Sequence, residues 1–418
     1  MLRGRRLFAV YAGVLGLIAV AFAAMLWAVL HSGFYGAPWH RIIVAVMPVS
    51  FEDLPGWHSA DVHASLQAFV RSCAILKTKF DATPMGKDGY AGPVKDWKPV
   101  CEAADSAAVD AAAARRFFEK SFVPVEIRPS QAAPLFTGYY EPLIHASRNR
   151  QGRYEVPIYA PPDNLVSADL GLFRAGLAGE RIYGCLENRQ LLRCPTRAEI
   201  NNQPAASLKP FLYADDPIAV FFLHIQGSGR ARLEDGTEVR LAYAGQNGRP
   251  YTAIGRTLIE RHLLVRGGLS MQAIRDWMKK HPREAKTVME TDASFIFFNE
   301  RPIGDPTLGS SGSEGVPLTP LGSAAVDPRI HPLGVPVYLS ASIPTDSGSG
   351  PGKSFNRLLI AQDSGGAIRG PARADIFWGF GPEAESMAGR MKSSGRFFVL
   401  LPRAVAARLG SDSALELT

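Results

Sequence analysis

The chain has 418 residues, of which 46% are hydrophobic and 20% are charged. These proportions exclude a disordered or fibrous protein, and a chain of this length is expected to bury a sizeable core and to fold as two domains behind a leader. The formal net charge of +7 favours an anionic partner, but the lysines and arginines are scattered along the chain, so nothing specific indicates nucleic acid.

The N-terminus predicts a membrane anchor within a leader of residues 1–35. Three arginines among the first six residues precede an uncharged run of 24 residues, 7–30. As a helix this run would extend roughly 36 Å, enough to cross a hydrocarbon core of about 30 Å, and the basic flank would stay in the cytoplasm. The alternative is a cleaved signal peptide ending near Ala21-Phe22-Ala23, although the apolar run continues beyond it. Both interpretations export the remaining chain.

Helices are expected on both sides of a β-rich middle region. Apolar residues at helical spacing predict a helix over 60–78, and a second helix is expected over 110–122. Short β-branched and aromatic segments separated by turn residues predict strands from 136 to about 251. A helix around Met271 to Met278 should end at Pro282.

A glycine-rich and serine-rich loop, 304–316, separates this helix from a final block of strands. Three strands are expected there, over 335–340, 357–361 and 396–401, in a compact barrel. The fold class is therefore mainly β with flanking helices, α+β.

Four cysteines become candidates for disulfides if the chain is exported to an oxidising compartment. Proximity in sequence favours Cys73 with Cys101 and Cys185 with Cys194. Three pairings are open, and so is a set of four buried thiols. No Cys-x-x-Cys spacing occurs, which disfavours a zinc site.

Several common catalytic motifs are absent from the sequence: a Gly-x-Ser-x-Gly elbow, a His-Glu-x-x-His helix and an intact nucleotide-binding loop. The histidines are dispersed. His224 is flanked by apolar residues, which predicts that it packs within a strand and binds no metal.

Three aspartates adjoin apolar stretches: Asp327, Asp363 and Asp375. A carboxyl group at the end of a buried strand must find donors or stay protonated, and a general acid near neutral pH requires the protonated form. Asp375 fits best, because Ile376, Phe377 and Trp378 follow it and their bulk would raise its pKa. For all three, a turn or a cap is the structural alternative, most strongly for Asp327 and Asp363.

The middle region carries polar and aromatic clusters of the kind that bind sugars, since aromatic faces stack on sugar rings and amides bond hydroxyl groups. They are Phe136-Thr-Gly-Tyr-Tyr-Glu-Pro142, Gln226-Gly-Ser-Gly-Arg230 and Tyr243-Ala-Gly-Gln-Asn-Gly248. The alternative is that they form hairpin turns, and Asn247-Gly248 is typical of a type I′ turn.

These clusters, in this order, resemble the membrane-bound lytic murein transglycosylase A family. The motifs that carry the resemblance are Phe136-Thr-Gly-Tyr-Tyr, Val156-Pro-Ile-Tyr, Thr196-Arg-Ala-Glu-Ile, Ile225-Gln-Gly-Ser-Gly, Tyr243-Ala-Gly-x-Asn-Gly-x-x-Tyr251, Ser294-Phe-Ile-Phe-Phe298, Asp363-x-Gly-Gly-Ala-Ile-x-Gly370 and Gly381-Pro-Glu-Ala384. The last part is similar to the three-aspartate domain, whose named positions match Asp327, Asp363 and Asp375. Many relatives begin with a lipidated cysteine, which this sequence lacks.

The resemblance implies a double-psi β-barrel domain from residues 36–143 and 251–410, with the three-aspartate region at about 304–404. Residues 144–250 would form an inserted second β-barrel domain, with glycan bound between the two. The implied location is the periplasmic face of a Gram-negative envelope, anchored through residues 7–30, or a soluble or outer-membrane-associated form if the leader is cleaved.

The resemblance also implies a reaction. Peptidoglycan is cut between N-acetylmuramic acid and N-acetylglucosamine without water, leaving a 1,6-anhydro end, and no metal or organic cofactor is needed. Asp375 would act as acid and then base, with Asp363 and Asp327 as supporting residues. The implied glycan contacts are Thr137, Tyr139, Gln226 and Ser228. Two alternatives are a hydrolase that uses Asp363 with Asp375, and a wall-binding protein without catalysis.

Overall fold

The computed structural model describes residues 42–86, 89–107, 110–130, 133–174, 177, 180–202, 208–265, 269–345, 352–409 and 413–417. Ile43–Leu415 form one compact unit. The predicted anchor, 7–30, lies outside the described residues. Within the described ranges, no helix has both the length and the apolar character needed to cross a bilayer.

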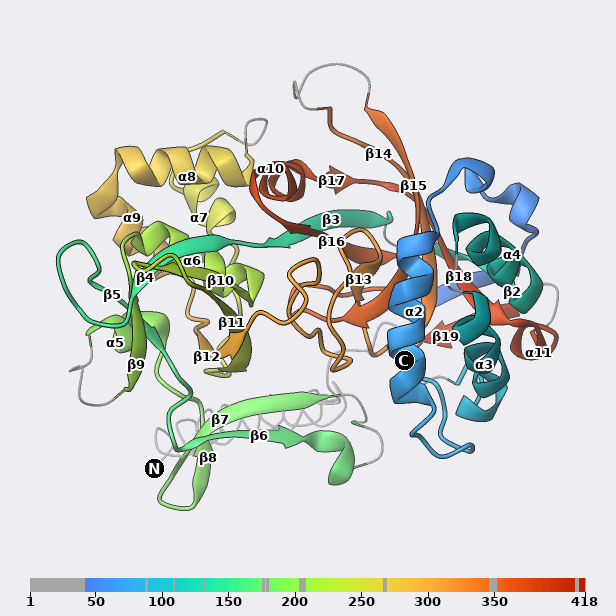
Figure 1. The fold of residues 1–418 in the computed structure, drawn as a ribbon. Coiled ribbons are helices and arrows are strands. Elements are labelled where there is room, and N and C mark those ends of the chain that lie inside the picture. Colours follow the sequence, from blue (N-terminus) through green and yellow to red (C-terminus); the bar gives the residue numbers. More distant parts are fainter. Residues whose placement is uncertain are drawn as a thin grey trace, which may run out of the picture. The chain divides into compact units, whose positions relative to one another are not determined.

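The largest sheet has ten strands (Figure 1). Asp363 and Asp375 lie on two of them, and Asp327 directly follows a third. The strand order is β17-β3-β16-β13-β15-β14-β18-β2-β1-β19. The bounds are β1 Ile42–Pro48, β2 Phe122–Pro129, β3 Leu135–Glu141, β13 Ser323–Val326, β14 Pro336–Ile343, β15 Lys353–Asp363, β16 Arg373–Phe380, β17 Lys392–Ser393, β18 Gly395–Pro402 and β19 Ser413–Leu417. Segments from both ends of the chain are therefore brought together in one sheet.

Helices pack against this sheet, as the amphipathic spacing predicts. They are α2 His63–Leu76, α4 Ala111–Ser121, α10 Pro382–Arg390 and α11 Arg403–Ala406. The helix α3 Lys98–Ala107 packs on α2 and α4, and short 3-10 turns lie at Phe51–Asp53, Trp57–Ser59 and Val94–Asp96. The Asp110 side chain caps α4 by accepting from the backbone N–H of Ala113 at 2.7 Å. Phe69 of α2 packs on Phe118 and Phe122, which closes the core between these helices and the sheet.

A six-stranded sheet is built from the middle of the chain, in the order β12-β11-β10-β4-β9-β5. Its strands are β4 Leu143–Ser147, β5 Val156–Tyr159, β9 Pro210–Ala214, β10 Gly229–Leu233, β11 Glu238–Gln246 and β12 Ile296–Pro302. A three-stranded sheet contains β6 Leu165–Asp169, β7 Arg181–Glu187 and β8 Gln190–Leu192, with the 3-10 turn Leu170–Leu172. These pairings confirm a mainly β fold with helices, whereas the closure of either barrel stays a prediction.

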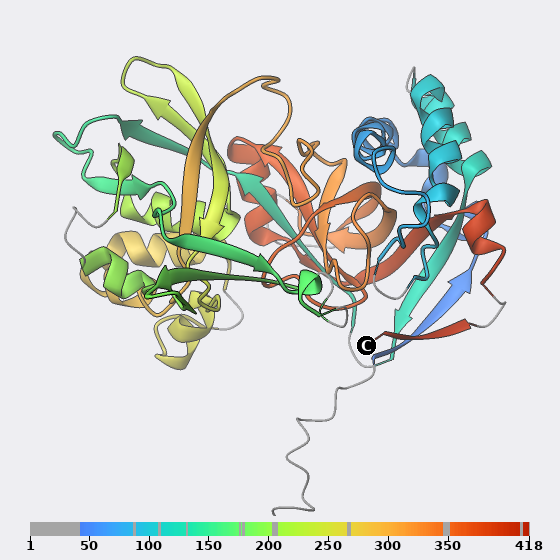
Figure 2. The ribbon, with the colours of Figure 1, turned by 90° about the horizontal axis from the view of Figure 1, so that it is seen from below.

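Five helices accompany these smaller sheets: α5 Arg197–Asn202, α6 Pro217–Gln226, α7 Ile254–Glu260, α8 Met271–Lys280 and α9 Pro282–Met289. Pro282 ends α8, as predicted, and also begins α9. The chain between β12 and β13 then crosses from the six-stranded to the ten-stranded sheet (Figures 1 and 2). This crossing contains the glycine-rich loop 304–316.

One local prediction and one of the alternatives were wrong. His224 lies in the helix α6 and not in a strand, although it is buried as expected. Asn247-Gly248 does not close a hairpin, since β11 pairs with β10 and β12. The fully buried Asn247 side chain instead donates to the carbonyls of Pro195 and Ala293, both at 2.8 Å.

Both predicted disulfides are present. Cys73 is bonded to Cys101, which joins α2 to α3, and Cys185 is bonded to Cys194, which joins β7 to the chain before α5. Proximity in sequence therefore selected the right pairing out of three.

Candidate active site

One face of β3 organises the predicted site. Alternate residues of a strand point to the same side, so Thr137, Tyr139 and Glu141 share a face. Thr137 contacts Asp375 on the neighbouring strand β16, and Tyr139 reaches Asp363 at the end of β15. A single strand thus brings together four of the residues that the sequence analysis selected.

Asp375 is half-buried on β16, where it is aligned with Thr137 on one side and with Ala325 of β13 on the other. The Thr137 hydroxyl donates to Asp375 Oδ1 and accepts from Arg373 Nη2 at 2.8 Å. Burial raises the pKa of Asp375, and the nearby charge of Asp363 raises it further; Arg373 and Thr137 act in the opposite direction and only partly offset this rise. The carboxyl group is therefore biased toward its protonated form.

Asp363 is held by donors from three segments. Its Oδ2 accepts from the Tyr139 hydroxyl at 2.9 Å, and its Oδ1 accepts from Ser313 N, Ser313 Oγ and Ser364 N, each at 2.9 Å. Burial raises the pKa of Asp363, while these hydrogen bonds favour its ionised form. Burial and then Asp363 raise the pKa of Tyr139 well above its usual range, so its hydroxyl stays a donor.

Ala325 separates the two carboxyl groups. It is aligned with Asp363 on one neighbouring strand and with Asp375 on the other. Two strand spacings put the two backbones roughly 10 Å apart. The methyl group of Ala325 fills little of that space, so both side chains face one small region of the sheet.

The aromatic residues after Asp375 do not all act as predicted. Phe377 shares the Asp375 face by alternation, and its ring lies 5.2 Å from that of Tyr139. Trp378 is on the opposite face, where its ring lies 5.8 Å from that of Phe355. Of Phe377 and Trp378, only Phe377 therefore lies on the face of Asp375.

Asp327 has a different setting, directly after β13. It is fully buried and accepts from Arg329 Nε at 2.9 Å, Arg329 Nη2 at 2.7 Å and Gly370 N at 2.9 Å. Burial would raise the pKa of Asp327, but these donors outweigh burial and lower it. An ionised, fully bonded carboxylate cannot donate a proton, and its contacts fix the segments at Arg329 and Gly370.

Gln226 and Ser228 lie where α6 leads into β10. Gln226 ends the helix, and its Oε1 accepts from the backbone N–H of Tyr140 at 3.0 Å. Gly227 follows with a φ of 82°, a conformation that glycine adopts readily at a helix end, and Ser228 is half-buried. The Gln226 contact joins this corner to β3, the strand that carries Thr137 and Tyr139.

Two site residues were missed by the sequence analysis. Arg373 lies two residues before Asp375, and the same period of two could have placed its side chain on the Asp375 face. Ser313 lies in the glycine-rich loop, about 50 residues before Asp363, and no local pattern connects the two. Only the tertiary fold could reveal that contact.

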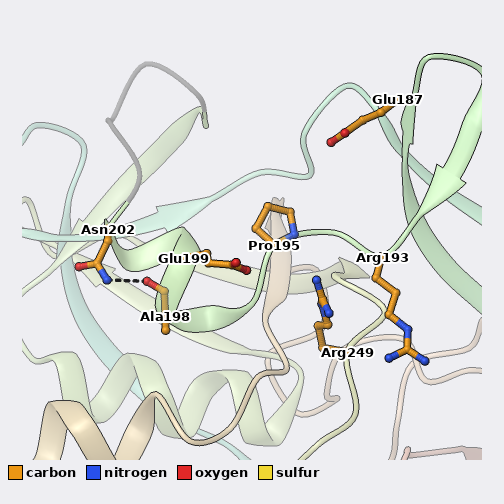
Figure 3. A pocket seen from close by; sticks show the side chains of 7 residues that line it. All are labelled: Glu187, Arg193, Pro195, Ala198, Glu199, Asn202 and Arg249. Carbon is orange, nitrogen blue, oxygen red and sulfur yellow. Dashed lines mark hydrogen bonds between the residues drawn. The ribbon is translucent and has the colours of Figure 1, made fainter.

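A separate pocket of about 630 Å³ lies between the β7–β8 hairpin and α5 (Figure 3). Arg249 enters it and is fixed by donating from Nε to the carbonyl of Cys194 at 2.7 Å. The lining residues are Glu187, Arg193, Pro195, Ala198, Glu199, Asn202 and Arg249. None of the predicted catalytic or glycan-binding residues lines this pocket.

The matches to known families cover most of the strands described above, although β1, β2 and β19 of the ten-stranded sheet lie outside the matched ranges. The MltA specific insert domain matches residues 135–299, and the 3D domain matches residues 322–401. The crystal structure of membrane-bound lytic murein transglycosylase from Agrobacterium tumefaciens is 33% identical, with a TM-score of 0.75 over 87% of this chain and 99% of that chain. The chain belongs to the membrane-bound lytic murein transglycosylase A family.

Other members of the MltA family give the same result. The structure of MltA from Neisseria gonorrhoeae is 33% identical, with a TM-score of 0.70 over 86% of this chain and 93% of that chain. Membrane-bound lytic murein transglycosylase A of Escherichia coli is 34% identical over 267 residues, which are 63% of this chain and 65% of that protein. The aligned part thus spans just under two thirds of this curated relative.

Proposed function

We propose that this MltA-family chain is a peptidoglycan lytic transglycosylase with Asp375 as its catalytic acid and base. The observation that carries the proposal is the setting of Asp375: a half-buried carboxyl group with a raised pKa, on the face it shares with Thr137 and Tyr139. A protonated carboxylic acid that keeps access to solvent can serve as a general acid near neutral pH.

The reaction needs one carboxyl group in two successive roles. Protonated Asp375 gives its proton to the glycosidic oxygen as the bond from C1 of N-acetylmuramic acid to that oxygen breaks. The C6 hydroxyl oxygen of the same sugar then bonds to C1, and its proton passes to the Asp375 carboxylate. The acid is regenerated, a 1,6-anhydro end forms, and no water is consumed.

Asp363 supports this cycle through its charge. Burial is the main cause of the raised pKa of Asp375, and the charge of Asp363 adds to it. A nearby carboxylate would also stabilise the positive charge that develops on the sugar. Asp327 supports it only indirectly, since its carboxylate is saturated by Arg329 and Gly370. Thr137 and Arg373 orient Asp375 through one shared hydroxyl group.

The substrate is inferred from the relatives. The solved structure of Escherichia coli MltA with bound chitohexaose, 28% identical with a TM-score of 0.60, holds a chain of aminosugars. We extend this binding to the glycan strands of peptidoglycan, with Tyr139, Gln226 and Ser228 near the bound sugars and the ten-stranded sheet closed as a double-psi barrel.

The relatives named membrane-bound also support a place in the cell envelope for this chain, on the periplasmic side. Residues 7–30 would supply the membrane attachment. Whether this segment is retained as an anchor or cleaved as a signal peptide is decided by sequencing the N-terminus of the protein isolated from the envelope.

Product analysis tests the reaction class. Purified sacculi treated with the wild-type protein should release muropeptides with 1,6-anhydro-N-acetylmuramic acid ends, which differ by one water from reducing ends in mass spectrometry. Reducing ends would instead support the hydrolase in which Asp363 and Asp375 act as a pair. An absence of any cleavage, with glycan binding retained, would support a passive wall-binding protein.

A further inference from the structure

A buried group of three charged residues connects the two large sheets. Glu141 at the end of β3 is 1% exposed, Arg230 of β10 is 6% exposed and Arg240 of β11 is 9% exposed. Glu141 Oε2 accepts from Arg230 Nε at 3.1 Å, and Glu141 Oε1 lies 3.6 Å from Arg240 Nε. We call these three residues the Glu141 cluster.

The two arginines of the Glu141 cluster bind backbone carbonyls of the loop that crosses between the sheets. Arg230 Nη2 donates to the carbonyls of Pro306 at 3.0 Å and Leu308 at 3.2 Å. Arg240 donates to the carbonyl of Leu308 at 2.6 Å and to that of Gly309 at 2.9 Å. The cluster contains one carboxylate and two guanidinium groups, so one positive charge has no carboxylate partner within it. The carbonyl dipoles of the loop stabilise this remaining charge.

Glu141 itself binds the next residue of the same loop. Its Oε1 accepts from both the backbone N–H and the hydroxyl of Ser310, each at 2.7 Å. The loop from 306 to 310 is thus fixed at four of its five residues by three side chains from the neighbouring strands. All of the contacts are charge-assisted, the stronger class of hydrogen bond.

The segment just beyond these contacts reaches the active site. Ser313 follows Ser310 by three residues and donates twice to Asp363. The backbone between them is tight, because Gly312 passes so close to β15 that an added Cβ would lie 2.5 Å from the carbonyl oxygen of Gln362. A shift of the loop at Ser310 would therefore move the Ser313 donors away from Asp363.

From this geometry we propose that Glu141, with Arg230 and Arg240, forms a positioning group that holds the loop 306–313 and thereby places the Ser313 donors on Asp363. Glu141 does not touch the reacting atoms in this account. It acts through Ser313, and it couples the six-stranded sheet to the catalytic aspartates. The inference deepens the proposed function and rests on it for the activity readouts.

The test compares Glu141→Gln with a matched control, Glu238→Gln. Glu238 also pairs with an arginine of β10, Arg232, at 2.6 Å, but this pair is solvent-exposed and binds no part of the loop. Glu141→Gln keeps the shape of the side chain and removes the charge. We expect kcat to fall on the order of 10–100-fold with KM near the wild-type value, and we expect Glu238→Gln to keep wild-type kcat.

Two further readouts separate positioning from general destabilisation. Ionisable groups facing Asp363 are Tyr139 and Asp375, and its remaining donors come from Ser313 and Ser364. Loss of the Ser313 donors would disfavour ionised Asp363, so the acid limb of the kcat profile should move to higher pH. In addition, Ser313→Ala should lower kcat less in the Glu141→Gln background than in the wild type, because both changes remove the contact of the Ser313 hydroxyl with Asp363.

Hydrogen exchange gives a readout that does not depend on activity. Amides of residues 307–313 should exchange faster in Glu141→Gln than in the wild type and in Glu238→Gln. Unchanged exchange, or a loss of kcat with an unmoved acid limb and full additivity with Ser313→Ala, would overturn the proposal. If the wild-type protein forms no anhydro ends, the proposed function fails while the exchange result still decides whether the Glu141 cluster holds the loop.

Discussion

The Thr137 hydroxyl donates to Asp375 and accepts from Arg373, so it influences the pKa of the proposed acid. Thr137→Val keeps the shape and removes a hydrogen bond that favours the carboxylate. The pKa of Asp375 should then rise, and the alkaline limb of the kcat profile should move to higher pH by up to about one unit. A pH–rate profile with an unmoved alkaline limb would show that this hydrogen bond does not tune the acid.

A second prediction concerns the contribution of Asp327 to stability. The pKa of Asp327 is lowered in the folded state. Its contribution to the free energy of unfolding is therefore fully present above the pKa of the unfolded chain, about 3.9, and is lost as the pH falls through the pKa of the folded protein. Asp327→Asn should lower the free energy of unfolding by about 1–3 kcal/mol at pH 7, with a smaller difference near pH 3. Denaturant unfolding at both pH values checks this, and an equal difference at both would contradict it.

The sequence favoured Asp375 as the acid and gave Asp363 and Asp327 the same supporting status. The difference arises from hydrogen-bond partners, most of which are distant in sequence: Arg329 and Gly370 stabilise the ionised form of Asp327, whereas Tyr139 and Ser313 reach Asp363 from other segments. A local pattern reports which residues adjoin apolar strands. It does not report how many donors the folded chain delivers to each carboxylate.

At the scale of single elements, helical periodicity predicted α2 and α4 closely, because each buries one stripe against the sheet. The helix α6 was missed because it is apolar on nearly every side and its run of aromatic residues looks like a buried strand. Its end signals were present: Asp216 caps it, Pro217 occupies its first turn and Gly227 ends it. These three signals together predict a helix at this position.

The loop 304–316 was predicted as a separating loop, yet it is packed against the catalytic strands. A Cβ at Gly309 would lie 2.4 Å from the Phe377 ring, and one at Gly312 would meet the Gln362 carbonyl, whereas Gly304 has open space. Gly312→Ala should therefore lower kcat at least 10-fold by displacing Ser313, and Gly304→Ala should leave kcat unchanged. Equal activity of the two variants in a sacculus-release assay would contradict this role for the loop.

Across the whole molecule, the two disulfides are expected to contribute unequally. The Cys73–Cys101 bond closes a sequence separation of 28 residues and the Cys185–Cys194 bond one of 9. On the chain-entropy account, replacing the first pair by alanine should cost about 3–4 kcal/mol and replacing the second about 2–3 kcal/mol. Chemical denaturation of both double variants measures the difference, and a larger loss from the second pair would refute the ordering.

In the proposed reaction one carboxyl group, Asp375, carries both proton transfers. The most direct test is mass spectrometry of the muropeptides released from purified sacculi by the wild type and by Asp375→Asn, with glycan binding measured in parallel. We expect 1,6-anhydro ends from the wild type. We expect Asp375→Asn to release at least about 10²-fold less material with glycan binding intact, because an amide can neither give nor take the proton. Reducing ends from the wild type, or anhydro ends from Asp375→Asn at a rate near that of the wild type, would contradict the proposed reaction.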